Sequence, residues 1–148
     1  MNILRALFGK SPKPLCVGVF ISAPVELNSP MVGIDGVCVE SLGIETSGDV
    51  FTPLIRKGSR IPCRADEIFS TAAHSQTSIQ INVFRGDKGK VAETYPLGVY
   101  EIIDIPPLPP GQPQIHVGFE ITRMRDIYMS AEWESTREKM KIRKYLKE

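Results

Sequence analysis

The chain has 148 residues, which is enough for one domain and too short for a second large one. Hydrophobic residues make up 42% and charged residues 24% of the chain, and this composition excludes wholesale disorder. The formal net charge of +1 gives no general attraction to nucleic acid. The longest apolar run is far shorter than the roughly 18 residues that a membrane helix needs. Twelve glycines and twelve prolines imply frequent turns, and turns between short apolar runs predict an all-β sandwich or barrel.

The N-terminal stretch, residues 1–31, is expected to be an extension and not a secretory signal, because its apolar segment is short and Arg5 interrupts it. Four apolar residues in it are spaced to share one face of a two-turn helix: Ile3, Leu4, Leu7 and Phe8. A frayed or self-packed terminus is the simpler alternative.

Short strands separated by turns are expected along the rest of the chain. The clearest alternation runs through residues 79–85, where Ile79, Ile81 and Val83 share one face. Residues 85–90 are expected to form a solvent-facing hairpin turn. The proline-rich segment 106–111 lacks most backbone donors and is therefore expected to be a stiff connector. The other expected strands are residues 15–21, 37–39, 50–56, 99–105 and 114–121.

The C-terminal tail, residues 134–148, carries six basic and three acidic residues. Met140 and Ile142 alternate as a final strand would, while Met140, Lys144 and Tyr145 fit a helix about as well. We favour an edge strand, because lysine on an edge discourages association with other strands. A nucleic-acid role is not favoured, since Tyr145 is the only aromatic residue in the tail.

The cysteines do not match a metal-site pattern. Cys16, Cys38 and Cys63 contain no CxxC pair, and two scattered histidines do not complete a set of four ligands. We therefore expect no metal, no cofactor, and three reduced thiols in a reducing compartment, the cytoplasm.

No set of residues indicates catalysis. Gly9-Lys10-Ser11 matches the end of a phosphate-binding loop, but Leu4 stands where the first glycine of that loop belongs. Neither His74 nor His116 is accompanied by a nucleophile elbow or an oxyanion motif. We expect His74 to lie in a loop and His116 to face solvent from a strand, and we expect the chain not to be an enzyme.

Three linked segments carry a more specific pattern. They are residues 42–55 followed by 61–62, residues 68–72 with Gln76 and 79–83, and residues 97–100 with 105–115. In this order and spacing they closely resemble the peptide-binding β-sandwich of the Hsp70 chaperone family. The resemblance runs from about residue 37 to 131 and more loosely to Tyr145.

The resemblance implies an antiparallel β-sandwich over residues 32–148, behind an N-terminal extension at residues 1–31. The ATPase domain that normally precedes this sandwich and the helical lid that normally follows it are expected to be missing. Pro110 stands where the family usually has an arginine that helps to hold the lid.

The resemblance also implies a peptide site between two loops. The loop around Thr46-Ser47-Gly48 is expected to form one wall and residues 70–78 the other, with backbone groups bonded to the peptide. Ser47 and Ala72 match the pair that arches over the peptide, and their small size implies a weak arch. Five apolar residues match the lining of the central pocket: Ile44, Val50, Phe69, Ile79 and Ile81. The remaining expected peptide-binding residues are Thr46, Ser70 and Gln76.

The resulting hypothesis is a stand-alone Hsp70-like module that binds extended hydrophobic segments of unfolded polypeptides, without ATP hydrolysis in the same chain. The alternative is a docking module for one fixed partner, in which the same apolar residues are ordinary sandwich core. A third possibility is self-association, with one molecule's terminus in its neighbour's cleft. Neither nucleic acid nor a membrane is expected as a partner.

Overall fold

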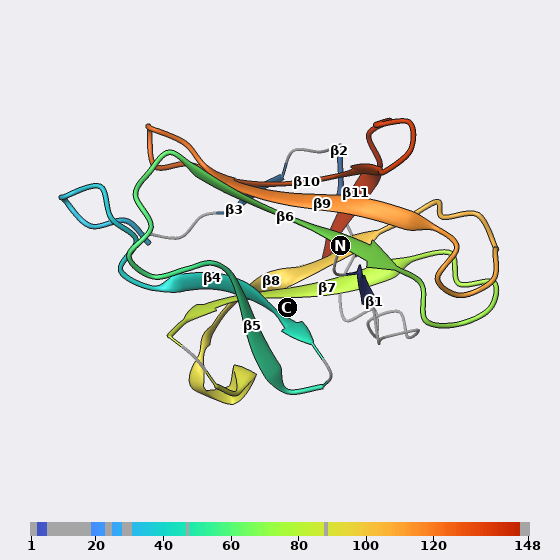
Figure 1. Ribbon diagram of the computed structural model, residues 1–148, viewed down its shortest axis with the longest axis horizontal. Helices are drawn as coiled ribbons and strands as arrows, with labels where there is room; N and C mark the ends of the chain where they lie inside the picture. The colour runs from blue at the N-terminus through green and yellow to red at the C-terminus, as the bar shows by residue number, and fades with distance from the viewer. Residues whose placement is uncertain are drawn as a thin grey trace.

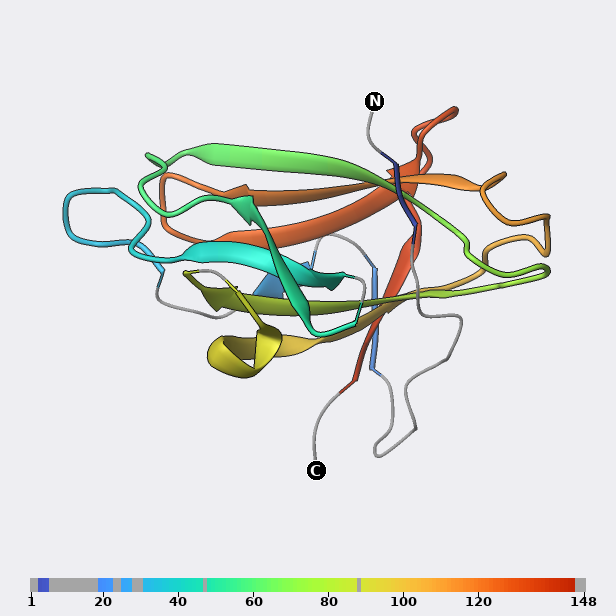
Figure 2. The ribbon, with the colours of Figure 1, turned by 60° about the horizontal axis from the view of Figure 1, so that its bottom comes forward.

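Two β-sheets pack face to face as a sandwich (Figure 1). The computed structural model describes residues 3–5, 19–22, 25–27, 31–46, 48–87 and 89–145, and in this part of the chain eleven strands are present. Figure 2 shows β6, β9 and β10 in one layer and β4, β7 and β8 in the other. No helix in these ranges is long and apolar enough to cross a membrane. The predicted antiparallel β-sandwich is confirmed.

Sheet A contains five strands in the spatial order β1-β6-β9-β10-β3. All of its neighbouring strands are antiparallel except β1, which runs parallel to β6. The strands are β1 (Ile3–Arg5), β3 (Val25–Leu27), β6 (Cys63–Ser70), β9 (Gln114–Ile121) and β10 (Ile127–Trp133).

Sheet B contains six strands in the order β2-β11-β8-β7-β4-β5, all antiparallel. A short 3₁₀ helix, η1 (Val91–Glu93), lies between β7 and β8. The strands are β2 (Val19–Ser22), β4 (Ser41–Thr46), β5 (Val50–Ile55), β7 (Ile79–Gly86), β8 (Tyr95–Ile102) and β11 (Lys141–Tyr145).

The core lies between the sheets and follows the predicted alternation. Side chains at alternate positions point to the same face of a strand, so each strand contributes every second residue. On β7 the inward residues Ile79, Ile81 and Val83 are at most 3% exposed. On β9 the four inward residues are completely buried: Ile115, Val117, Phe119 and Ile121.

The C-terminal tail forms β11, so the predicted strand is confirmed and the helix is wrong. Its predicted edge position is also wrong, because β2 pairs with its outer side from Val19 to Ser22. The lysines of β11 therefore lie on a strand with a neighbour on each side. The part of the predicted strand 15–21 that precedes Val19 lies outside the described residues.

The N-terminal segment contributes strands where the sequence suggested a two-turn helix or a frayed or self-packed end, and the pairing of β1 with β6 agrees with the self-packed alternative. Residues 3–5 form β1, so a helix there is wrong, while Leu7 and Phe8 lie outside the described residues. The strands β2 and β3 also come from residues 1–31, and they pair with β11 and β10.

Other predicted boundaries differ from the structure. Residues 37–39 contribute only isolated bridges, at Val37 and Cys38. The predicted strand 99–105 is β8, which begins earlier and ends at Ile102, shortly before Asp104 takes a left-handed φ of 61°. The turn predicted at 85–90 is part of a longer connection that includes η1. The strands β4, β6 and β10 were not among those expected from alternation.

We expect Gly43→Ala to destabilise the sandwich, because β4 and β5 approach each other too closely for a side chain there. A Cβ atom on Gly43 would lie 2.3 Å from the Thr52 carbonyl oxygen and 2.8 Å from Pro53 Cα. These are backbone atoms that cannot rotate away, so the cost is expected to be about 2–3 kcal/mol of unfolding free energy. Chemical denaturation of the two proteins measures it.

Gly48→Ala, in the turn of the same hairpin, is the matched control. The space around Gly48 is open within 4 Å, and only its left-handed φ of 62° opposes a side chain. That strain is partly offset by lower entropy in the unfolded state, so we expect a loss of about 1 kcal/mol or less. Equal losses in the two variants would contradict the close-approach argument.

A second prediction concerns Tyr100, which is fully buried on β8. Its hydroxyl has no hydrogen-bond partner among the described residues, and burial raises its pKa from 10.0 to about 12. Tyr100→Phe removes only an unpaired polar atom, so at pH 7 it should leave stability within about 1 kcal/mol of the parent or raise it. Above pH 10 the unfolded chain ionises first, so the parent should lose about 2–3 kcal/mol by pH 12 and the variant should lack that loss. Denaturation curves at pH 7, 10 and 11.5 test this, and parallel pH profiles would contradict it.

Candidate functional site

The first predicted wall of the peptide site is the tip of the β4–β5 hairpin. The Glu45 carboxylate accepts a hydrogen bond from the Asp49 backbone N–H at 3.1 Å and another from the Asn82 side-chain amide at 3.2 Å. The hydroxyls of Thr46 and Thr52 are 2.5 Å apart across the hairpin. Side chains of β4, β5 and β7 therefore fix the tip. Ser47, predicted as half of the arch, lies outside the described residues.

The hairpin tip is also held from outside by the β7–β8 connection. The Phe51 N–H donates to the Gly89 carbonyl at 2.9 Å, and the Val91 N–H donates to the Asp49 carbonyl at 3.1 Å. An isolated bridge joins Val50 to Lys90. The described residues of the hairpin tip are therefore hydrogen-bonded on two sides.

The second predicted wall is the β6–β7 loop, and Gln76 organises it. The Gln76 side-chain oxygen accepts from the N–H groups of Ala72 and Ala73 at 2.9 and 3.1 Å, and its amide donates to the Ser78 carbonyl at 2.7 Å. Gln76 is only 8% exposed. Its side chain is therefore engaged by the loop itself, while Ala72 and its neighbours Ala73, His74 and Ser75 are exposed.

The proline-rich connector that precedes β9 is hydrogen-bonded to this loop and to the end of β6. The Ser70 hydroxyl donates to the Pro113 carbonyl at 2.5 Å. The Gly111 N–H donates to the Thr71 carbonyl at 3.0 Å, and the Ser75 N–H donates to a carbonyl of the connector at 3.2 Å. The connector thus keeps the predicted conformation without a strand and holds the end of β6 in place. The Ser70 side chain is occupied by this contact.

Four of the five predicted pocket residues come together, and the fifth does not. Ile44, Phe69, Ile79 and Ile81 belong to one contiguous apolar cluster between the sheets and are between 0% and 4% exposed. Val50 is 46% exposed at the start of β5 and is not part of that cluster. The four buried residues therefore serve as core in this conformation, whatever else they do.

Two surface hollows lie away from those four side chains. The larger has a volume of about 750 Å³ and opens beside the end of the β6–β7 loop, near β8 and β11. The smaller, about 330 Å³, lies between the proline-rich connector and the end of β10. The larger hollow is lined by Thr77, Ser78, Glu101, Ile103, Asp104, Ile105, Pro106, Lys141 and Arg143.

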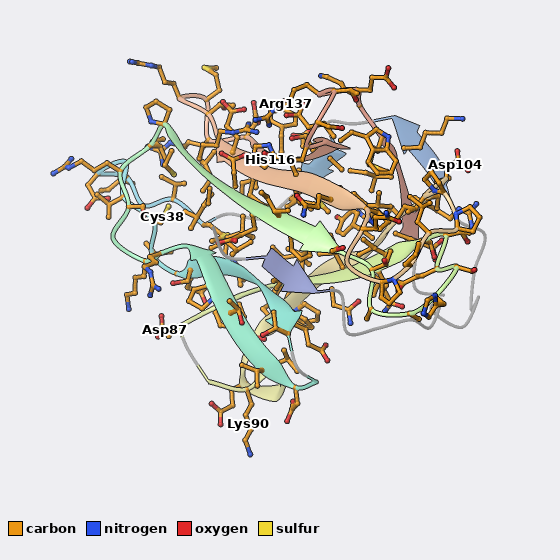
Figure 3. All side chains as sticks on the ribbon, turned by 45° about the vertical axis from the view of Figure 1, so that its right-hand side comes forward. Cys38, Asp87, Lys90, Asp104, His116 and Arg137 are labelled. Atoms are coloured by element: carbon orange, nitrogen blue, oxygen red, sulfur yellow. The ribbon has the colours of Figure 1, made fainter. Side chains whose placement is uncertain are left out.

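A charged cluster on the outer face of sheet A was missed by the sequence analysis. His116 lies 3.4 Å from Glu132 and 3.6 Å from Asp66, and Arg137 bonds both His116 and Glu132 (Figure 3). The Arg137 hydrogen bond, followed by contact with His116, lowers the pKa of the Glu132 carboxyl. His116 faces outward as predicted but is only 18% exposed. Its neighbours come from β6, from β10 and from the turn after β10, so no local spacing could have indicated the cluster. His74 is exposed in the β6–β7 loop, as predicted.

The described cysteines are free thiols. Cys38 is buried and Cys63 is half-buried, and their side chains contact each other. Burial, aided by the neighbouring Cys63 thiol, raises the pKa of Cys38 to about 11, and burial raises that of Cys63. Within the described ranges, no group of three or more His, Cys, Asp or Glu residues is arranged to hold a metal ion. Cys16 lies outside those ranges.

Comparisons of the sequence with known proteins find two matches. A family model described as Hsp70 protein matches residues 20–147. A chaperone protein DnaK from Methanothermobacter thermautotrophicus is 51% identical to this chain over 81 residues. The aligned part is 55% of this chain and 14% of that relative, so the chain spans a small fraction of the relative's length.

The bonds made by Gln76 lead to a prediction about the second wall. Gln76→Ala removes one acceptor and one donor, leaves two N–H groups without their partner, and should cost about 1–3 kcal/mol of stability. In hydrogen exchange, the amides of Ala72 and Ala73 should lose protection. Gln76→Glu keeps the acceptor and loses only the bond to Ser78, so it should retain protection at those two amides. Unchanged exchange in Gln76→Ala would contradict the organising role.

Proposed function

The chain belongs to the Hsp70 family, and from this premise we propose that its β-sandwich binds extended hydrophobic segments of unfolded polypeptides. The proposed site lies between the β4–β5 hairpin and the β6–β7 loop. Ile44, Phe69, Ile79 and Ile81 supply the apolar surface, and Thr46, Ser70 and Ala72 lie at the walls. Binding in this proposal needs no ATP hydrolysis in the same chain.

The observation that carries the proposal is the pairing at the outer edge of β6. An extended segment, β1, already lies there in register with Ile68–Ser70. Recognition by strand addition requires such an edge, since main-chain hydrogen bonds supply affinity and side-chain pockets supply selectivity. The braced loops on either side support the same interpretation, because rigid walls reduce the ordering cost of binding.

The expected affinity is modest. Burial of one leucine or isoleucine side chain contributes about 1.5–3 kcal/mol, and each backbone hydrogen bond about 0.5–1.5 kcal/mol. The costs of association and of ordering a flexible peptide oppose these gains. The balance corresponds to a dissociation constant that is roughly micromolar or weaker, with fast exchange.

A second candidate is a docking module that keeps the fold and binds one fixed partner. The burial of the four pocket residues, at 0% to 4% exposure, favours it, because side chains committed to the core do not receive a ligand. The two candidates differ in selectivity. A peptide-binding module should accept several unrelated leucine-rich sequences with similar affinity, whereas a docking module should accept none of them.

The experiment is a titration of the full chain into a fluorescently labelled leucine-rich heptapeptide, followed by anisotropy. Saturable binding in the micromolar to hundred-micromolar range is expected. Ala72→Arg should weaken binding at least about fivefold, because it places a long charged side chain at the exposed wall. Ile79 and Ile81 are unsuitable for this test, since a polar residue at either position would unfold the core.

Ala73→Arg is the matched control, with the same substitution at the next exposed position of the same loop. We expect its affinity to remain within about twofold of the parent. Equal weakening in both variants would remove the assignment of Ala72 to the site. No saturable binding by the parent or by a variant with a released β1, described below, would refute the peptide-binding function.

A further inference from the structure

We propose that the chain's own N-terminal segment, β1, occupies the peptide site and competes with any client peptide. This inference rests on the proposed function, because it names the regulation of the same site. The segment would act as an internal occupant that a client peptide must displace.

The topology of sheet A supports this role. Among the described strands β1 pairs only with β6, and its residues Ile3, Leu4 and Arg5 lie opposite Ile68, Phe69 and Ser70. The other side of β6 is paired with β9 along all eight of its residues. An extended client that adds to sheet A next to β6 therefore needs the edge that β1 already covers.

The position of β1 along β6 coincides with the predicted site. Its register ends at Ser70, the last residue of β6, and the β6–β7 loop begins at the next residue. Figures 1 and 3 draw β1 beside the arrowhead of β6, on the side that faces the β4–β5 hairpin. Both predicted walls therefore lie near this three-residue strand.

The burial of the pocket residues agrees with an occupied site. Phe69, which is in register with Leu4, is 4% exposed, and Ile44 and Ile81 are 1% and 3% exposed. These values apply with β1 in place. All three residues belong to the core cluster, so their burial is compatible with an occupied site and also with ordinary core packing.

The sequence of the segment has the chemistry expected of a client. Residues 1–8 contain six apolar residues and one charge, Arg5. The family match begins at residue 20, so β1 lies outside the part of the chain that matches the family model. The occupant is thus a feature of this chain added next to a shared site.

The strength of the occlusion follows from two opposing properties. A strand of three residues makes few hydrogen bonds, which favours release. The covalent link to the rest of the chain gives it a high effective concentration, which favours rebinding. The apparent affinity of a client is then its intrinsic affinity multiplied by the fraction of molecules in which β1 is released.

The test uses proline substitutions in the full chain. Alternate residues of a strand direct their N–H groups to the same neighbour, so Ile3→Pro and Leu4→Pro together cover both alternatives. The variant that loses a bond to β6 should bind the labelled leucine-rich heptapeptide about tenfold more tightly, if about a tenth of parent molecules have β1 released. Leu4→Ala keeps every backbone N–H and removes only the side chain, so comparing it with Leu4→Pro separates the contribution of the backbone hydrogen bond from that of the side chain.

In a second measurement, the N-terminal segment is added as a separate peptide. A labelled peptide of residues 1–10 should bind the tighter proline variant saturably, and the unlabelled heptapeptide should displace it. A peptide of the same composition in scrambled order is the control. Light scattering over a concentration series should show a constant mass for the parent, because the occupant comes from the same chain.

The outcomes separate the two proposals. Tighter client binding by a proline variant, with displacement of the 1–10 peptide, supports both. Equal client binding by the parent and both proline variants overturns the internal occupant and leaves the peptide-binding function in place. No client binding by any of the three proteins overturns the peptide-binding function and the occupant role with it. A mass that rises with concentration and falls back in the proline variants assigns the segment to a neighbouring molecule and overturns occupancy within one chain.

Discussion

The structure depends on the unequal pairing of the two edges of β6. One edge is bonded to β9 along the whole strand, from Cys63 opposite Ile121 to Ser70 opposite Gln114. Among the described strands, the other edge carries β1 alone, over the last three residues. A strand that is anchored on one side and sparsely paired on the other is a stable template for an added segment, because its position does not depend on what the open edge holds. The two loops that flank this end are braced separately, one by Gln76 and the other by Glu45.

The same apolar residues must satisfy two demands in such a site. Ile44, Phe69, Ile79 and Ile81 hold the two sheets together, and in the proposed function they also receive a client side chain. An empty pocket of this kind lowers the stability of the fold, because its apolar walls lose packing contacts. A segment that covers the pocket restores those contacts. Burial of the walls and a role in binding are therefore compatible when an occupant is present.

The sequence predicts the parts of the fold that obey a local period. The alternation at residues 79–85 and 114–121 identified β7 and β9 and their inward faces, because burial of one face selects every second residue. β6 was missed because its first five residues include Arg64, Asp66 and Glu67, and this polar stretch hides its strand character. The edge position of β11 was wrong because β2, about 120 residues earlier in the chain, covers it. Such pairings depend on tertiary contacts that no local window contains.

The sequence likewise predicted only a part of the candidate site. The resemblance predicted two walls and named four residues that meet in one cluster, because these belong to a pattern distributed over several segments. It did not reveal that the side chains of Gln76 and Ser70 are engaged within the protein, or that Val50 is exposed. Those facts arise from the hydrogen-bond partners and the direction of each side chain.

If β1 occupies the site, the affinity for a client peptide is measured in competition with a segment of the same chain. The segment is always present at one copy per molecule, so the threshold that a client must exceed does not depend on protein concentration. Clients that form only a few backbone bonds, as β1 does, gain nothing by displacing it. A client with an additional large apolar side chain gains the burial of that side chain, about 1.5–3 kcal/mol, which corresponds to roughly tenfold to a hundredfold in binding. In the proposed function, the tether would therefore convert a weakly selective apolar site into one that favours longer or more hydrophobic segments.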